Sequence, residues 1–146
     1  MKHTTLILFI VFISTFSAFA QSAEEYYKPS PESATVVFYR GSQLWRAAVN
    51  FTIRANGEEL CRLSNNRFLV YRTPPKTVNF SNVAGGLNIP SKEKLEMQLE
   101  AGKVYYVQCD IKSGLFADRM EMTEVTESTA KRKMEGVKPD NCIQSK

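Results

Sequence analysis

The sequence predicts an all-β protein, a small antiparallel β-sandwich of about seven to eight strands with a short C-terminal helix. Three observations predict this class. Short runs of β-branched and aromatic residues recur along the chain, several alternate apolar and polar residues with the two-residue period of a strand, and turn-forming residues separate them at fairly regular intervals. The chain has 146 residues, and the part that follows the first 20 suits one domain with one hydrophobic core.

The first 20 residues predict an export signal. Lys2 supplies a positive start, Leu6 to Ile13 is an apolar run too short to span a bilayer comfortably, and Ala18 to Ala20 offers small residues before a cut. We expect cleavage after Ala20, with an uncleaved anchor reaching Phe19 as the alternative. No later segment approaches the roughly 20 apolar residues of a membrane helix. The mature protein is therefore expected to be exported, periplasmic or secreted, soluble, and without a transmembrane segment.

Composition divides the mature chain into three parts. Prolines and charged residues dominate the segment after the signal, a composition that buries little and stays extended, so it predicts a flexible leader. Glu127 to Glu135 has the composition of a short helix. The expected boundaries are 1–20 for the signal peptide, 21–33 for the flexible leader, 34–126 for the β-sandwich, and 127–146 for the short helix and tail.

The first strands of the domain have the most direct local signals. Ala34–Arg40 is a dense β-branched and aromatic run without a helical period. Ala47–Ala55 alternates apolar and polar residues, which predicts a half-buried strand. Asn56 and Gly57 supply the positive-φ pair that a tight hairpin needs, and Leu60–Leu63 returns as the partner strand.

The later strands are read from the same patterns. Two prolines, Pro74 and Pro75, cannot continue a sheet ladder and so end the strand before them. Lys103–Lys112 alternates most clearly of all and is expected to be a central strand. The later segments expected to be strands are Arg67–Arg72, Thr77–Val83, Leu95–Leu99, Lys103–Lys112 and Met120–Val125.

The cysteine and histidine content limits the chemistry. Cys61, Cys109 and Cys142 predict one disulfide and one buried or reactive thiol in an oxidising compartment, with Cys142 joined to either Cys61 or Cys109; three unpaired cysteines are the alternative. Their wide spacing fits no metal motif. Signal cleavage removes His3, the only histidine, which excludes Ser-His and Cys-His catalysis and imidazole zinc sites. We therefore predict no enzyme activity, no metal and no cofactor.

Positive charge gathers in the first half of the domain, where seven arginine and lysine residues stand against two glutamates between Val36 and Phe80. Arginines interleaved with aromatic residues suit anionic lipid head groups, cell-wall polymers or a partner protein, and an exported protein would not meet nucleic acid. The exposed loop from Gly41 to Arg46 carries Leu44 and Trp45 and is the best candidate contact point. The candidate binding residues are Arg40, Trp45, Arg46, Arg67 and Arg72. In the alternative interpretation the arginines simply face water and Trp45 caps the core.

The order of these motifs resembles a known family. The motifs that carry the resemblance are Ala34–Arg40, Asn56-Gly57, Pro74-Pro75, Leu99–Lys103, Tyr105–Val107 and Gly114–Phe116. Together they resemble small exported bacterial domains, often lipoproteins, known as domain of unknown function 2846, from about Ala34 to Val125. The resemblance implies a compact β-sandwich-like domain at the bacterial envelope and brings no agreed activity. Lys76 replaces a glycine usual in the family, and the absence of a lipobox cysteine puts the family's membrane tether in doubt here.

These observations favour a non-enzymatic envelope module that binds a partner protein or an anionic surface. Two alternatives remain: a structural or accessory subunit whose β edges pair with another envelope protein, and a hydrolase that uses two carboxylates.

Overall fold

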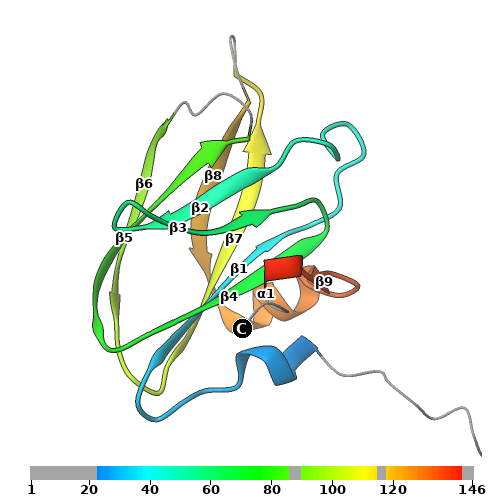
Figure 1. Cartoon of the computed structure of the whole chain (residues 1–146). Helices are drawn as coiled ribbons and strands as arrows, with labels where there is room; N and C mark the ends of the chain where they lie inside the picture. The colour runs from blue at the N-terminus through cyan, green and yellow to red at the C-terminus, as the bar shows by residue number, and fades with distance from the viewer. Residues whose placement is uncertain (1–22, 86–89, 115–117, 143–146) are drawn as a thin grey trace, which may run out of the picture.

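The computed structural model describes residues 23–85, 90–114 and 118–142. These residues form nine strands in two facing sheets, with one short α-helix near the C-terminus (Figure 1). The predicted all-β sandwich with a C-terminal helix is thereby confirmed. The predicted signal peptide lies outside the described residues.

The larger sheet has five strands in the order β8-β7-β1-β4-β9. Their bounds are β1 Ala34–Arg40, β4 Arg67–Thr73, β7 Val104–Lys112, β8 Arg119–Val125 and β9 Lys138–Pro139. Strand β1 lies in the middle, antiparallel to β4 and parallel to β7. The sheet is therefore mixed, whereas the sequence predicted antiparallel pairing, because β1 and β7 meet only after the chain has passed through the other sheet.

The smaller sheet has four strands in the order β3-β2-β5-β6. Their bounds are β2 Phe51–Ala55, β3 Glu58–Leu63, β5 Lys76–Ala84 and β6 Pro90–Leu99. The predicted hairpin joins β2 to β3 through Asn56 at φ 51° and Gly57 at φ 89°, the left-handed conformation that this pair tolerates. Strand β2 begins at Phe51 and not at Ala47, so the four residues before it belong to a loop.

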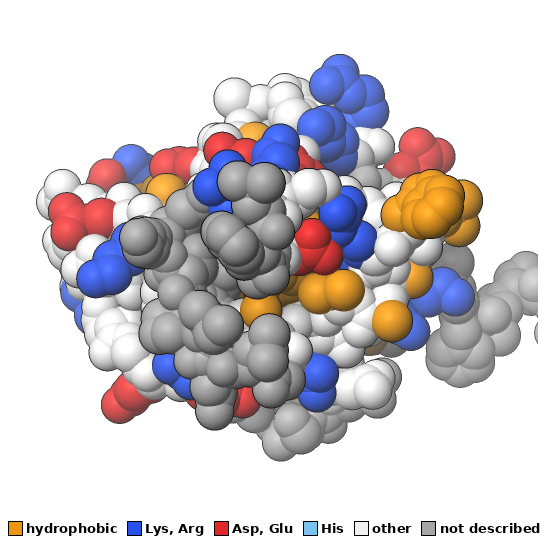
Figure 2. Space-filling view, turned by 90° about the horizontal axis from the view of Figure 1, so that it is seen from above, with side chains coloured by type: hydrophobic (Ala, Val, Ile, Leu, Met, Phe, Trp, Pro, Cys, Tyr) orange, Lys and Arg blue, Asp and Glu red, His pale blue; other side chains and the backbone are white. Residues whose placement is uncertain are grey.

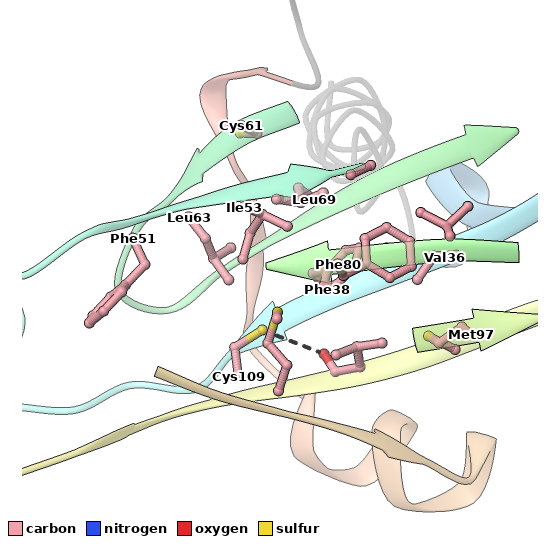
Figure 3. Packing of buried hydrophobic residues seen from close by; sticks show 14 of the residues in the cluster. Val36, Phe38, Phe51, Ile53, Cys61, Leu63, Leu69, Phe80, Met97 and Cys109 are labelled. Atoms are coloured by element: carbon pink, nitrogen blue, oxygen red, sulfur yellow. Dashed lines mark hydrogen bonds between the residues drawn. The ribbon is translucent and has the colours of Figure 1, made fainter. Parts of the chain in front are cut away.

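The main core lies between the two sheets (Figure 3). Alternate residues of β1 point into it, among them Val36 and Phe38, and Phe38 meets Phe80 of β5 edge to face with ring centroids 4.9 Å apart. Each large side chain buried in this way stabilises the fold by about 2 kcal/mol. The alternation that predicted the strands therefore also selected the side chains that fill the core.

A second apolar cluster covers the outer face of the five-stranded sheet. It joins Tyr39 of β1 and Phe68 of β4 to Tyr27 and Met134 from two flanking segments. Tyr27 belongs to the 3-10 helix η1 (Ala23–Tyr27), and Met134 is the C-cap of the helix α1 (Glu127–Lys133), whose first turn Thr126 caps through its side chain. Because β1 is covered on both faces, all seven of its residues are buried. The segment predicted as a flexible leader thus contributes a core residue, because Tyr27 is only 6% exposed.

Candidate functional site

The most exposed apolar side chains of the described chain lie on the loop between β1 and β2, residues 41–50. Leu44 is 93% exposed and Trp45 is 95% exposed. The loop projects from the sandwich between β1 and β2 (Figure 1), and a group of hydrophobic side chains stands out at the right-hand edge of the molecule in Figure 2. The sequence allowed two interpretations of Trp45, a contact residue or a cap on the core. Its exposure shows that it does not cap the core.

Buried Arg40 holds this loop against the end of β1. Arg40 is 1% exposed, and its guanidinium donates to the backbone oxygens of Val49 and Arg46, the latter at 2.7 Å. The two carbonyls therefore bond to a side chain instead of to a neighbouring strand, which explains why the predicted strand over 47–55 begins only at Phe51. On the other side of the tip, the backbone N–H of Gln43 donates to Asn65 Oδ1 at 3.0 Å. The loop tip is thus tied back on both sides.

Among the described residues, the hydrogen-bond partners of the Arg40 guanidinium are the backbone carbonyls of Val49 and Arg46. Burial lowers the pKa of the guanidinium, and the neighbouring Cys109 opposes that shift only in part. Arginine nevertheless stays protonated in proteins because its ordinary pKa is so high. The Nε of Arg40 has no hydrogen-bond partner among the residues that the structure describes. Arg40 is therefore a structural residue of the loop and is not available to a ligand.

Arg46 is the only charged residue in loop 41–50, and the chain itself neutralises it. Its Nε lies 2.9 Å from Asp118 Oδ2, and its Nη2 donates to Ser113 Oγ at 2.6 Å. Both partners belong to the segment between β7 and β8. The loop surface consequently combines two large apolar side chains with almost no net charge.

The remaining candidate arginines lie on β4 and also bond within the chain. Arg67 donates to the backbone oxygen of Pro139 at 3.4 Å, which supports the pairing of β9 with β4. Arg72 donates to the backbone oxygen of Tyr26 at 2.8 Å and so holds η1 on the sheet. The five candidate residues do not form one constellation: only Arg46 shares the exposed loop with Trp45.

The cysteines adopt one of the two pairings that the sequence left open. Cys61 of β3 and Cys142 form a disulfide across 81 positions of sequence, which ties the C-terminal tail to the smaller sheet. Cys109 is a buried free thiol, and burial, with a smaller effect of Asp110, raises its pKa far above the ordinary value. A protonated, buried thiol is a poor nucleophile. The described residues contain no group of three or more His, Cys, Asp or Glu side chains suited to hold a metal ion.

The partners of the arginines were not predicted from the sequence. One signal was available for Arg40: it ends a run of apolar, aromatic and β-branched residues, all of which are buried in the structure. No comparable signal exists for Asp118 and Ser113, because they are more than 60 positions away from Arg46 and alternation says nothing about such distances.

The comparisons with known proteins give a family and no function. No helix within the described ranges is long and apolar enough to cross a membrane. No curated protein matches the chain. A family described as "Protein of unknown function (DUF2846)" matches residues 30–122, which include loop 41–50 and Asp118 but not α1, β9 or Cys142. The match covers most of the sandwich, and the chain therefore belongs to the DUF2846 family.

Proposed function

We propose that this chain is an exported, non-enzymatic binding module of the cell envelope that docks the tip of loop 41–50 into an apolar pocket of a partner protein. The observation that carries the proposal is the nearly complete exposure of Leu44 and Trp45 on a loop that the chain holds in place. Tryptophan is among the residues most enriched at the energetic centres of protein interfaces. Burying these two side chains would contribute on the order of 4 kcal/mol.

The way in which the loop is held supports a protein partner. Arg40 bonds two carbonyls of the loop, and Arg46 is anchored to Asp118. A loop that is already ordered loses little conformational entropy on binding, so more of the apolar contact energy becomes affinity. A rigid apolar projection of this kind suits a preformed pocket of matching shape.

The sequence also suggested an anionic surface as the partner. The charge of the loop argues against that alternative. An anionic lipid or polymer would be recognised by cations free to face it. In this region Arg40 is buried, and Arg46 already contacts Asp118. Neither arginine therefore offers a free cation beside Trp45.

Export is part of the proposal and has two supports. The first is the signal-like character of the first 20 residues. The second is the Cys61–Cys142 disulfide, a bond that persists in oxidising compartments such as the bacterial periplasm.

Site-specific cross-linking tests the proposal. A photoreactive benzoylphenylalanine replaces Trp45 in the full chain, which is irradiated in the native envelope. The matched control carries the same group at Glu58, an exposed residue of the β2–β3 hairpin. We expect one dominant adduct from position 45 and none from position 58. Equal adducts from both positions, or none from either, would contradict the proposal.

Reconstitution with the cross-linked partner then tests the chemistry of the contact. The partner is identified by mass spectrometry, purified, and titrated with the full chain. Trp45→Ser is expected to weaken the affinity by at least tenfold, and added salt is expected to change it by less than threefold because the loop is neutral. In parallel, sedimentation with phosphatidylglycerol vesicles should show no Trp45-dependent binding. If the chain instead binds vesicles through Trp45 and forms no protein adduct, the proposal of a protein partner is wrong and the loop binds a membrane.

A further inference from the structure

A cavity lies on the outer face of the five-stranded sheet, between η1, β7 and α1. Its volume is about 400 Å³, which is the size of site that holds small molecules. Loop 41–50 contributes none of the residues that line it. Its polar side chains are Glu24, Glu25, Tyr27, Lys28, Tyr106, Glu127 and Lys131.

Two buried tyrosines form the floor of this cavity. Tyr27 of η1 is 6% exposed and Tyr106 of β7 is 4% exposed, and their rings meet edge to face with centroids 5.8 Å apart. Neither hydroxyl bonds to another of the described residues, and neither is among the buried polar atoms that lack a partner, so both oxygens reach the cavity. Each hydroxyl can therefore donate and accept a hydrogen bond there. Two hydroxyls that face one cavity suit a ligand with a polar group.

The rim of the cavity is acidic. Three glutamates, Glu24, Glu25 and Glu127, face two lysines. The ammonium of Lys131 lies between two of these carboxylates, 3.1 Å from Glu24 and 3.0 Å from Glu127. The chain's own lysine thus demonstrates that an ammonium group fits between Glu24 and Glu127.

The negative field of the rim reaches the two hydroxyls. Burial raises the pKa of Tyr106 to about 12, and Glu127 adds to the rise. Burial and Glu24 likewise raise the pKa of Tyr27, although Lys131 opposes them. Both hydroxyls stay protonated at neutral pH, so each can donate one hydrogen bond and accept another.

We propose that this cavity binds a small molecule that carries a protonated primary amine and a neutral polar group. The ammonium would lie between Glu24 and Glu127 in place of the Lys131 ammonium, and the polar group would bond the hydroxyls of Tyr27 and Tyr106. The side chain of Lys131 is about half exposed, at 47%, and surface ion pairs of this kind contribute little to stability, so Lys131 can turn into solvent. The site is independent of the contact proposed for loop 41–50.

A matched pair of probes tests the need for the amine. The full chain is titrated with ethanolamine and with ethylene glycol, which replaces the amine by a hydroxyl, and chemical shifts in the NMR spectrum report binding. We expect ethanolamine to bind at least tenfold more tightly than ethylene glycol, with the largest shifts at Tyr27 and Tyr106. Equal responses to both probes would overturn the proposal.

Two kinds of variant test the residues. Tyr27→Phe and Tyr106→Phe should each weaken ethanolamine binding by at least threefold, whereas Tyr39→Phe should not, because the Tyr39 hydroxyl already donates to Gln108 and lies outside the cavity. Lys131→Gln should tighten binding several-fold, because it removes the competing ammonium and leaves two carboxylates free. Unchanged or weaker ethanolamine binding in a folded Lys131→Gln protein would refute the proposal that the ligand's ammonium takes the place of the Lys131 ammonium. Circular dichroism establishes that each variant is folded.

Discussion

At the scale of single residues, Arg40 shows how a charge can serve the fold and not a ligand. A guanidinium is planar and carries five donors on three nitrogens, so it can bond carbonyls that lie farther apart than the three donors of a single ammonium nitrogen can reach. In this chain it bonds Val49 and Arg46 from a buried position at the end of β1. The sequence suggested that Arg40 belongs to an anion-binding surface. In the structure Arg40 instead holds the apolar loop 41–50 in place.

Replacing Arg40 by alanine is expected to destabilise the protein by about 3 kcal/mol, because the change removes two hydrogen bonds to loop carbonyls and leaves a cavity under the loop. Urea unfolding followed by circular dichroism measures the loss. Arg40→Lys should recover only part of it, since one ammonium cannot span both carbonyls. Full stability in Arg40→Ala would show that these hydrogen bonds do not hold the loop.

The buried thiol of Cys109 gives a second prediction at this scale. Its pKa is raised, so the thiol stays protonated and unreactive well above the ordinary pKa of cysteine. Iodoacetamide at any pH from 6 to about 9 should therefore leave the native protein unmodified, while the unfolded, unreduced protein should take up one equivalent at the upper end of that range. Mass spectrometry counts the adducts. Rapid alkylation of the native protein would contradict the burial of Cys109.

At the scale of elements, the two ends of the chain complete the sandwich. The helix η1 precedes the family match and α1, β9 and Cys142 follow it, yet all of them pack against the sheets (Figure 1). Lys131 joins the two ends through its contact with Glu24. These flanking elements cover an apolar face that the sheet would otherwise expose to water.

The disulfide between Cys61 and Cys142 is expected to stabilise the protein by about 4 kcal/mol, because it closes a long loop in the unfolded chain. The double variant Cys61→Ser and Cys142→Ser should lose that amount in urea unfolding. Cys109→Ala serves as the control. A reducing agent should lower its stability by the same amount as it lowers that of the wild type, because both proteins contain the disulfide. A double variant as stable as the wild type would mean that the tail is held by its other contacts.

The packing of η1 predicts that Tyr27→Ala costs about 3 kcal/mol, since the change removes a buried aromatic ring from the second cluster. Thermal unfolding compares it with Lys28→Ala, which alters an exposed neighbour. An equal, small effect of both substitutions would indicate that the segment 21–33 is the flexible leader that its composition suggested.

At the scale of the whole molecule, one sandwich carries two separate surfaces. Loop 41–50 offers an apolar tip, and the cavity between η1 and α1 offers carboxylates and tyrosine hydroxyls. Each surface has its own chemistry, so a variant in one leaves the other intact. Export would place both surfaces in the cell envelope, where a partner protein and small amines can meet them.

Export also makes a prediction about the whole chain. Expression of the full chain with its own N-terminus should yield an envelope protein that begins at Gln21, because the small residues before it form the expected cut site. Mass spectrometry of the intact protein and N-terminal sequencing locate the cut. Ala20→Leu should retain the precursor in the membrane. A cytoplasmic protein of full mass would contradict the prediction.

The sequence by itself determined the class of fold, the position of most strands and the hairpin at Asn56-Gly57. These features are local: alternation places side chains on the two faces of a strand, and an Asn-Gly pair adopts positive φ without a distant partner. The exposure of loop 41–50 was one of two interpretations that local chemistry allowed.

Only the tertiary structure decided which distant residues meet. It selected Cys61 over Cys109 as the partner of Cys142, paired β1 with β7 in parallel, and buried Arg40 and Tyr27. The physical reason is that these contacts depend on how two sheets and their flanking segments pack together, and local patterns carry no information about packing across such distances in sequence.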